Sequence, residues 1–411
     1  MFDEVAGRPS PARSIPQPEG ETLQLASGSR ASRYAGFSVC IVALASSAAC
    51  DAFERDYDAW VDTLASGRVR VYNRDLLRSS PEPDFVLVEE LRLGQAPGRT
   101  ATAGPGTFSN VVGLAVDEVG RIYVADEIDQ GIRVFGPQGD FLRRFGRQGE
   151  APGEFQDLRG VAWHPSGVLL AMDTGARRVT AFDSLGTVLA TAGHHEEAGN
   201  PGPFWRADTD TLGFIYERDW DSPTWARRVL KHQLLHDLTL DAVDTIALAS
   251  RGPHFDTIPT NWRPLWSAGS DGSMWHGNTN RFLFLKVTDR QDTTLAVELR
   301  RPTPRLGGRE RDSLGAAWGL PSNALPRYKA VLTSFHAARD GGLWVWNPHV
   351  GQTWGRWEVF DGNGYHLGQA ATPVLLALDP RPVFGPGAIT GVTRDDAGVQ
   401  YVVRLRVPGL D

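Results

Sequence analysis

Short apolar runs separated by polar turns recur from Val111 to the end of the chain. The segment 111–145 holds four such runs, at Val111–Asp117, Arg121–Asp126, Ile132–Phe135 and Phe141–Phe145. Apolar and polar residues alternate in the outer runs, whereas the inner runs are nearly all apolar, as in strands that are buried on both faces. The pattern predicts one four-stranded antiparallel sheet.

The first two runs return almost unchanged 47 residues further along the chain. The segment Gly113–Asp126 reads GLAVDEVGRIYVAD, and its counterpart Gly160–Asp173 reads GVAWHPSGVLLAMD. A later Phe, at 135 and at 182, keeps the same offset. Sheets repeated with a period near 40–50 residues are the signature of a β-propeller.

A glycine in the first turn of each copy marks the repeat. An acidic or polar residue at the first position of such a turn and Gly at the fourth favour a tight hairpin. The turn glycines are spaced by 47, 46, 59, 69 and 57 residues, at Gly120, Gly167, Gly213, Gly272, Gly341 and Gly398. We therefore expect six blades, with Arg300–Arg327 as an inserted loop in the longest gap.

The last copy ends soon after its turn glycine, at Val399–Val407, and lacks two strands. Two apolar runs near the other end, Arg68–Tyr72 and Phe85–Leu93, remain to complete it, which would leave no open sheet edge at that point. The predicted fold is all-β, a six-bladed β-propeller of four-stranded antiparallel blades over residues 68–411. Its last blade is closed by N-terminal strands within 68–93, after a helical or irregular tether at 51–67.

The first two copies resemble NHL repeats, whose pattern reads roughly G-x-A-V-D-x-x-G-x-I-Y-V-A-D and then I-x-V-F. Gly113 to Phe135 follows it almost residue for residue, and Gly160 to Phe182 departs at Trp163 and Met172. The chain as a whole is similar to exported six-bladed propeller proteins of bacteria, many of them lipoproteins and mostly without assigned function. The resemblance implies the fold and leaves the ligand open.

Both cysteines lie in one apolar stretch near the start of the chain. Residues 34–50 carry no charge, follow Arg30 and Arg33, and end in Ser-Ala-Ala-Cys50. A basic flank, a short apolar run and small residues before a cleavage site predict a secretory signal peptide over residues 1–50. The end resembles a lipobox, which implies lipidation of Cys50. Plain cleavage and an uncut anchor are the alternatives. We expect an exported protein in the periplasm or on the outer surface, held at the membrane as a lipoprotein.

The composition limits the classes of molecule that the protein is expected to bind. The 411 residues carry a net charge of -7, which disfavours nucleic acid because phosphate binding needs a basic surface. We expect a monomer that binds an unknown protein, peptide or glycan. Trp residues outside the strand runs could form a platform for sugars or peptides, at Trp205, Trp220, Trp225 and Trp262.

Polar residues recur six positions after the turn glycines. They are Asp126, Asp173, Asp219, Asn278, Asn347 and Arg404. Such side chains commonly cap turns by accepting from nearby main-chain N–H groups. The alternative is a site for Ca²⁺ or Zn²⁺, since carboxylate and amide oxygens bind cations, with Asp126, Asp173, Asn278 and Asn347 as ligands.

Three arginines occur where the chain enters an innermost strand, at Arg159, Arg206 and Arg263. Arginine suits carboxylate and phosphate groups. Together with the acidic residues of the same face, Asp126, Asp173 and Asp219, they define a candidate ligand mouth. The alternative is that the arginines form structural ion pairs with the acidic set.

An enzyme remains the alternative to a binding scaffold. NHL-type propellers include a peptidylglycine lyase that binds zinc through histidines, and lactonase-like propellers use a Glu/Asn/Asp metal site. The ten histidines do not recur at one repeat position, and Asn278 and Asn347 match only the residue type. No G-x-S-x-G or phosphate-binding loop occurs. We expect a binding scaffold of the cell envelope rather than a metal-dependent hydrolase or lyase.

Overall fold

The computed structural model describes residues 59–408, apart from 66, 75–81, 96–103, 105, 194–206, 210–213, 222–225, 235–239, 249–263, 289–291, 347–354 and 386. The predicted signal peptide with Cys50 lies outside this part. The strands, in chain order, are β1 (Ala59–Thr63), β2 (Val69–Arg74), β3 (Phe85–Val86), β4 (Val88–Leu93), β5 (Val111–Val116), β6 (Ile122–Asp126), β7 (Gly131–Phe135), β8 (Phe141–Phe145), β9 (Leu158–His164), β10 (Val168–Asp173), β11 (Arg178–Phe182), β12 (Val188–Gly193), β13 (Ala207–Thr209), β14 (Phe214–Asp221), β15 (Ala226–Leu234), β16 (Leu240–Leu248), β17 (Pro264–Ala268), β18 (Met274–Asn278), β19 (Arg281–Val287), β20 (Thr293–Arg300), β21 (Ser334–Ala337), β22 (Leu343–Trp346), β23 (Gly355–Phe360), β24 (His366–Thr372), β25 (Val383–Gly385), β26 (Ala388–Arg394) and β27 (Gln400–Arg406).

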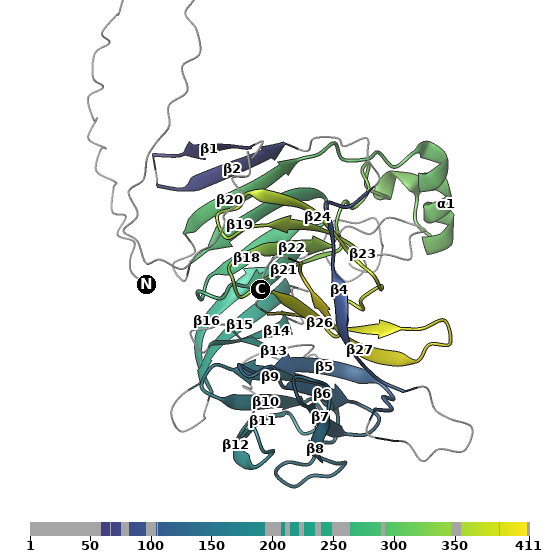
Figure 1. Cartoon of the computed structure of the whole chain (residues 1–411). Helices are drawn as coiled ribbons and strands as arrows, with labels where there is room; N and C mark the ends of the chain where they lie inside the picture. Colours follow the sequence, from purple (N-terminus) through teal and green to yellow (C-terminus); the bar gives the residue numbers. More distant parts are fainter. Residues whose placement is uncertain are drawn as a thin grey trace, which may run out of the picture. The chain divides into compact units, whose positions relative to one another are not determined.

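The protein is all-β, with multiple four-stranded antiparallel sheets (Figure 1). Four consecutive strands form each of the β5–β8, β9–β12 and β13–β16 sheets, and a last sheet has the order β25-β26-β27-β4. β2 and β1 extend the β17–β20 sheet to six strands, and β3 extends the β21–β24 sheet to five. The four strands predicted in the first copy are confirmed to within one residue at each boundary. Their periodic apolar pattern is strong because β6 and β7 are buried at every position.

The turn glycines adopt the backbone geometry that the sequence predicted. Gly120 and Gly167 both have φ 84° and close the turns between the first two strands of their sheets. Only glycine reaches this left-handed region at little cost. In the first turn Asp117 accepts from the N–H groups of Val119 and Arg121, which fixes the turn from its other end.

Clusters of buried side chains join one sheet to the next. Tyr123 of the β5–β8 sheet stacks on Trp163 of the β9–β12 sheet, with ring centroids 5.4 Å apart. Phe284 packs edge-on against Phe335 across the β17–β20 and β21–β24 sheets. Further clusters join the β21–β24 sheet to the last sheet, and the last sheet to the β5–β8 sheet. Where the side chains are described, each sheet therefore completes its core against a neighbouring sheet.

The N-terminal strands pair differently from the prediction. β4 completes the last sheet by pairing antiparallel with β27, as expected for part of Phe85–Leu93. Placing Arg68–Tyr72 in the same sheet was wrong, because β2 pairs in parallel with β20, and β3 pairs in parallel with β24. β1 lies within the segment 51–67, where a helical or irregular tether was expected, and it pairs antiparallel with β2.

The last sheet also needs only one added strand instead of two. Gly398 closes the turn between β26 and β27, which are the second and third strands of that sheet. The sequence interpretation placed this turn between the first and second strands. β25 was missed because it has only three residues and follows Pro380 and Pro382.

The segment Arg300–Arg327, predicted as an inserted loop, contains α1 (Gly308–Trp318) and η1 (Ser322–Ala324). The helix ends at Gly319, whose φ of 64° is typical of a helix C-terminus. Its glycines and weak apolar periodicity explain why the sequence pattern did not predict it. Within the described residues, no helix has the length and apolar character needed to cross a bilayer.

Candidate functional site

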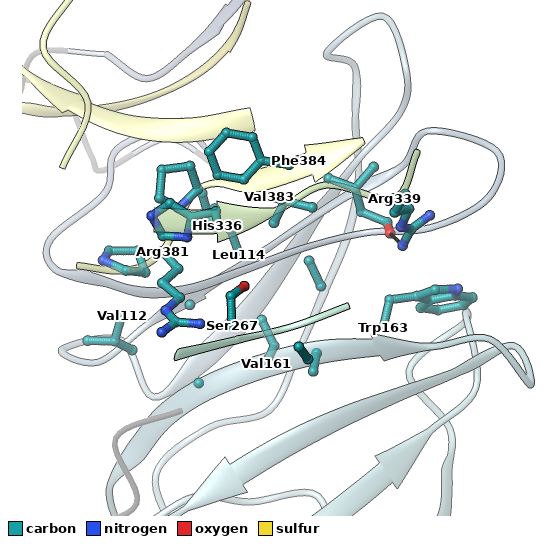
Figure 2. Close-up of a pocket in the computed structure, with 18 of the residues that line it drawn as sticks. Val112, Leu114, Val161, Trp163, Ser267, His336, Arg339, Arg381, Val383 and Phe384 are labelled. Carbon is teal, nitrogen blue, oxygen red and sulfur yellow. Dashed lines mark hydrogen bonds between the residues drawn. The ribbon is translucent and has the colours of Figure 1, made fainter. Parts of the chain in front are cut away.

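The first strands of five sheets line one cavity, which we call the inner-strand cavity. Its wall consists of β5, β9, β17, β21, the start of β25 and the residues just outside these strands (Figure 2). The cavity has a volume of about 160 Å³. A buried water needs roughly 10–15 Å³, so the space suits a ligand with on the order of ten non-hydrogen atoms.

Close packing of two glycines allows the wall to form. A Cβ atom on Gly113 of β5 would lie 2.7 Å from the main-chain nitrogen of Val161 and 2.9 Å from the Cα atom of Gly160. The repeat therefore uses glycine at this position to bring β5 against β9. Both glycines line the cavity, so the NHL-like pattern contributes directly to its shape.

The polar lining residues are cationic or neutral. They are Arg159, Ser267, His336, Arg339 and Arg381, and no Asp or Glu belongs to the described lining. The remaining lining residues are mostly small or aliphatic. A guanidinium group attracts an anion through its charge and its N–H donors. The inner-strand cavity is therefore electrostatically suited to an anionic group.

Neighbouring groups hold the three arginines in place. Arg159 forms ion pairs with Glu127 at 2.5 Å and with Asp157 at 3.0 Å. Two carboxylates therefore compensate its charge, but neither belongs to the acidic set, Asp126, Asp173 and Asp219, that the sequence interpretation offered as its partners. The Nη2 group of Arg339 donates to the Val116 carbonyl at 3.4 Å, and that of Arg381 to the Trp266 carbonyl at 3.2 Å.

His336 and Ser267 lie on the same wall. His336 is 4% exposed, and its ring stacks on Phe384 with centroids 4.9 Å apart. The Ser267 hydroxyl accepts from the Ala337 N–H at 2.9 Å, which ties β17 to β21. A hydroxyl that accepts one hydrogen bond can still donate its own hydrogen to a ligand.

The structure places Asp126 and Asp173 away from this cavity. Both are fully buried and accept from main-chain N–H groups that precede an innermost strand: Ser109 and Asn110 for Asp126, Gln156 and Asp157 for Asp173. Arg133 lies 3.3 Å from Asp126. These carboxylates act as turn caps, and they are not brought together.

Some of the other predicted site residues have described partners, and the rest lie outside the described residues or have side chains that are not described. Asn278 accepts from the N–H of Asn280, and Arg404 pairs with Glu90 of β4 on the outer part of the last sheet. Arg206, Arg263 and Asn347 lie outside the described residues, as do Trp205, Trp225 and Trp262. Asp219 and Trp220 belong to β14, whose side chains are likewise not described. The described residues contain no group of three or more His, Cys, Asp or Glu suited to a metal ion.

Sequence reasoning missed Arg339 and Arg381 as site residues. Arg339 stands in the turn motif Arg-Asp-Gly that marks the fifth copy, so it was interpreted only as part of a turn. Arg381 precedes β25, the strand that the repeat pattern did not find. A signal existed in Pro380-Arg381-Pro382, since prolines on both sides restrict the backbone around one cation.

No family model matches the chain, and no curated protein matches it. Solved structures are similar to it, and they are propeller-type folds. A member of the DUF4221 family from Bacteroides vulgatus has a TM-score of 0.48 and 10% identity, over 78% of this chain and 98% of that one. A gluconolactonase from Xanthomonas campestris has a TM-score of 0.41 and 14% identity, over 74% of this chain and 88% of that one. Virginiamycin B lyase from Staphylococcus aureus has a TM-score of 0.38 and 10% identity, over 72% of this chain and 94% of that one.

Proposed function

We propose that this chain is an exported six-bladed β-propeller that binds a small anionic ligand in its inner-strand cavity. The sheets packed in succession are its blades, and the cavity between their first strands is its central channel. β4 completes the last blade from the N-terminal side, as one strand does in a propeller that is closed by both ends of the chain. The packing of the last sheet on the β5–β8 sheet supports this closure.

The charge of the cavity lining carries the proposal for an anion. Among the described lining residues there are three arginines and no carboxylate, in a protein whose net charge is -7. Arg159 forms ion pairs with Glu127 and Asp157, whereas Arg339 is exposed and donates to the Val116 carbonyl. A guanidinium binds a carboxylate or phosphate through paired hydrogen bonds, which adds direction to the attraction.

Export and membrane attachment rest on the sequence of residues 1–50. We propose cleavage before Cys50 and lipidation of its thiol, which place the propeller on the cell envelope. The test is processing in cells. Globomycin and Cys50→Ser should each block maturation of the precursor. Unchanged processing under both conditions would contradict lipidation and leave plain cleavage.

Ligand binding is tested on the purified mature chain. Titration calorimetry with small carboxylates, inorganic phosphate and neutral amides of the same size should give heat only with the anions. Arg381→Gln should weaken anion binding at least tenfold, whereas Arg309→Gln, on the exposed start of α1, should leave it unchanged. Equal binding of anions and neutral amides would overturn the proposal, and so would equal effects of both variants.

A further inference from the structure

The outer part of the six-stranded sheet carries arginines and aromatic rings on one face. β20, β2 and β1 are the last three strands of this sheet (Figure 1). Their pairing aligns Trp60 with Tyr72 and Tyr72 with Glu298, and side chains of directly paired residues lie on the same face. Three arginines alternate along the same face, and we call the set the arginine–aromatic face: Trp60, Arg70, Tyr72, Arg74 and Arg300.

The arginine–aromatic face is the solvent side of the sheet. The opposite face, with Val71 and Val297, belongs to a buried core cluster. Trp60 is 37% exposed, and the Arg300 side chain is 53% exposed. Within the described residues, β1 is the terminal strand of the sheet and pairs with β2 alone. The face is therefore accessible to a large partner.

The aromatic rings and guanidinium groups of this face contact one another. Arg300 lies 4.5 Å from the centroid of Trp60 and 4.8 Å from that of Tyr72. Arg70 lies 4.7 Å from the Tyr72 centroid, and the two rings stack 4.8 Å apart. Such contacts hold the arginines in place without cancelling their charge. The face thus presents fixed cations next to amphipathic rings.

Two carboxylates share this face with its three arginines. Glu298 pairs with Arg70 at 2.5 Å, and its other oxygen lies 3.8 Å from Arg300. Asp62 of β1 is the residue opposite Arg70. One carboxylate therefore serves two guanidinium groups, and the Arg300 pair is long and exposed. A screened pair of this kind leaves the arginine able to attract another anion.

The inserted segment that follows β20 adds further cations. Residues 300–329 contain seven Arg or Lys residues and two acidic ones, in a protein whose net charge is -7. Arg305 and Arg327 are both exposed, and they lie near each other because Arg305 forms a bridge with Tyr328. Tyr328 is 45% exposed and Trp318 is 44% exposed. This segment therefore repeats the combination of exposed arginines and exposed aromatic rings.

A short stretch of chain links the arginine–aromatic face to the proposed lipid anchor. Cys50 precedes Trp60 by ten residues, which span at most about 36 Å. The residues between Cys50 and Trp60 carry four carboxylates and one arginine, so attraction to anionic headgroups has to come from the folded part. A site on a short tether acts at a millimolar effective concentration. A weak attraction to the bilayer surface is therefore sufficient.

We propose that the arginine–aromatic face, together with Arg305 and Arg327, docks on the anionic phospholipid headgroups of the bilayer that holds the Cys50 anchor. This inference rests on the proposed lipid attachment and adds a fixed orientation of the folded part toward the membrane. Guanidinium groups donate paired hydrogen bonds to phosphate. Trp and Tyr side chains favour the headgroup region of a bilayer.

Cosedimentation with lipid vesicles tests the proposal. The protein is the mature chain with Cys50→Ser, which carries no lipid, so binding reports on the protein surface. We expect it to bind vesicles of phosphatidylcholine and phosphatidylglycerol in equal parts, to ignore phosphatidylcholine alone, and to dissociate at high salt. Arg305→Gln/Arg327→Gln should weaken binding roughly 25-fold, at about fivefold per arginine. Arg177→Gln/Arg394→Gln is the matched control, because it removes the same charge at exposed positions of other sheets.

Arg300→Gln tests the sheet part of the surface separately and should weaken vesicle binding about fivefold. Thermal melts verify that each variant is folded. No binding to either vesicle type, equal binding to both, or equal binding by wild type and Arg305→Gln/Arg327→Gln overturns the docking proposal. A dimer in sedimentation equilibrium that Arg300→Gln abolishes would assign the face to a second copy of the chain and overturn the proposal as well.

The outcomes also separate this inference from the proposed lipid attachment. Lipid processing at Cys50 without vesicle binding leaves the anchor and overturns the docking surface. Charge-dependent vesicle binding without lipid processing overturns the anchor and supports the docking surface as a membrane contact in its own right.

Discussion

The guanidinium of Arg301 lies 2.6 Å from a carboxylate oxygen of Glu358, a side chain that is 1% exposed. His366 contacts the other oxygen at 2.8 Å, and the Gln369 amide donates to the first at 2.9 Å. Burial alone raises the pKa of Glu358. The hydrogen bond from His366 and the charge of Arg301 outweigh burial and lower the pKa to about 2.

Glu358→Gln should therefore destabilise the protein and remove part of its acid sensitivity. A carboxylate with a lowered pKa stabilises the fold above its ordinary value of 4.5, and this contribution is lost as the pH falls toward 2. The variant should lose roughly 3 kcal/mol of unfolding free energy at pH 7, measured by urea titration. The difference from wild type should shrink between pH 4.5 and 2.

Glu310→Gln is the control for this experiment. Glu310 pairs with Lys329 at 2.7 Å, but its side chain is 45% exposed, so its loss should cost less than about 1 kcal/mol. A Glu358→Gln variant with wild-type stability, or a constant difference across this pH range, would contradict the argument.

The capping role of Asp126 gives a prediction about metal ions. Asp126→Ala leaves the N–H groups of Ser109 and Asn110 without their acceptor and should cost about 2–4 kcal/mol. Asp396→Ala, at an exposed turn position, should change stability by less than about 0.5 kcal/mol.

Calcium should leave the melting temperature of wild type unchanged, because both oxygens of Asp126 already accept from N–H groups. The measurement is a thermal melt with CaCl₂ and with EDTA. A melting temperature that rises with Ca²⁺ in wild type, and does not rise in Asp126→Ala, would restore the cation-site interpretation.

The close approach of β5 and β9 distinguishes the two glycines that occupy the same position in the first two copies of the repeat. Gly113→Ala places a Cβ atom 2.7 Å from the Val161 nitrogen and should cost about 1–3 kcal/mol. Gly160→Ala meets no atom within 4 Å and should cost far less. Urea unfolding of both variants compares them directly. Equal losses would show that the strand contact is not what requires glycine.

The local part of the fold could be predicted from the sequence, because each turn carries its own chemistry. Gly120 needs a left-handed backbone and Asp117 caps its turn, so these residues mark a hairpin wherever they recur. Pairing between distant segments has no such local signal. β2 pairs with β20 in a register that joins Val69 to Leu295, and nothing near Val69 specifies this partner.

In the candidate site, too, the residues at repeat positions could be predicted from the sequence, and the others could not. Arg159 was predicted because it occupies a repeat position at the entrance to a strand. Arg339 and Arg381 come from different positions of two copies, and only folding places both in the lining of one cavity. The caps at Asp126 and Asp173 followed from the repeat, and the choice between turn cap and metal ligand required their hydrogen-bond partners.

Asn73 connects β2 to the hairpin that leads into β24. Its side chain is buried, its amide donates to the Gly364 carbonyl at 2.9 Å, and its oxygen accepts from the His366 N–H at 2.8 Å. Asn73→Ala leaves both main-chain groups without these bonds, so we expect a loss of about 2–3 kcal/mol in unfolding free energy.

Limited proteolysis tests whether this loss is local. Asn73→Ala should be cleaved near β1 and β2 faster than wild type, because the bonds that hold this segment to the β21–β24 sheet are gone. Asn363→Ala is the matched control, since Asn363 is exposed in the same hairpin. Cleavage of both variants at the wild-type rate would mean that pairing of β2 with β20 alone secures the segment.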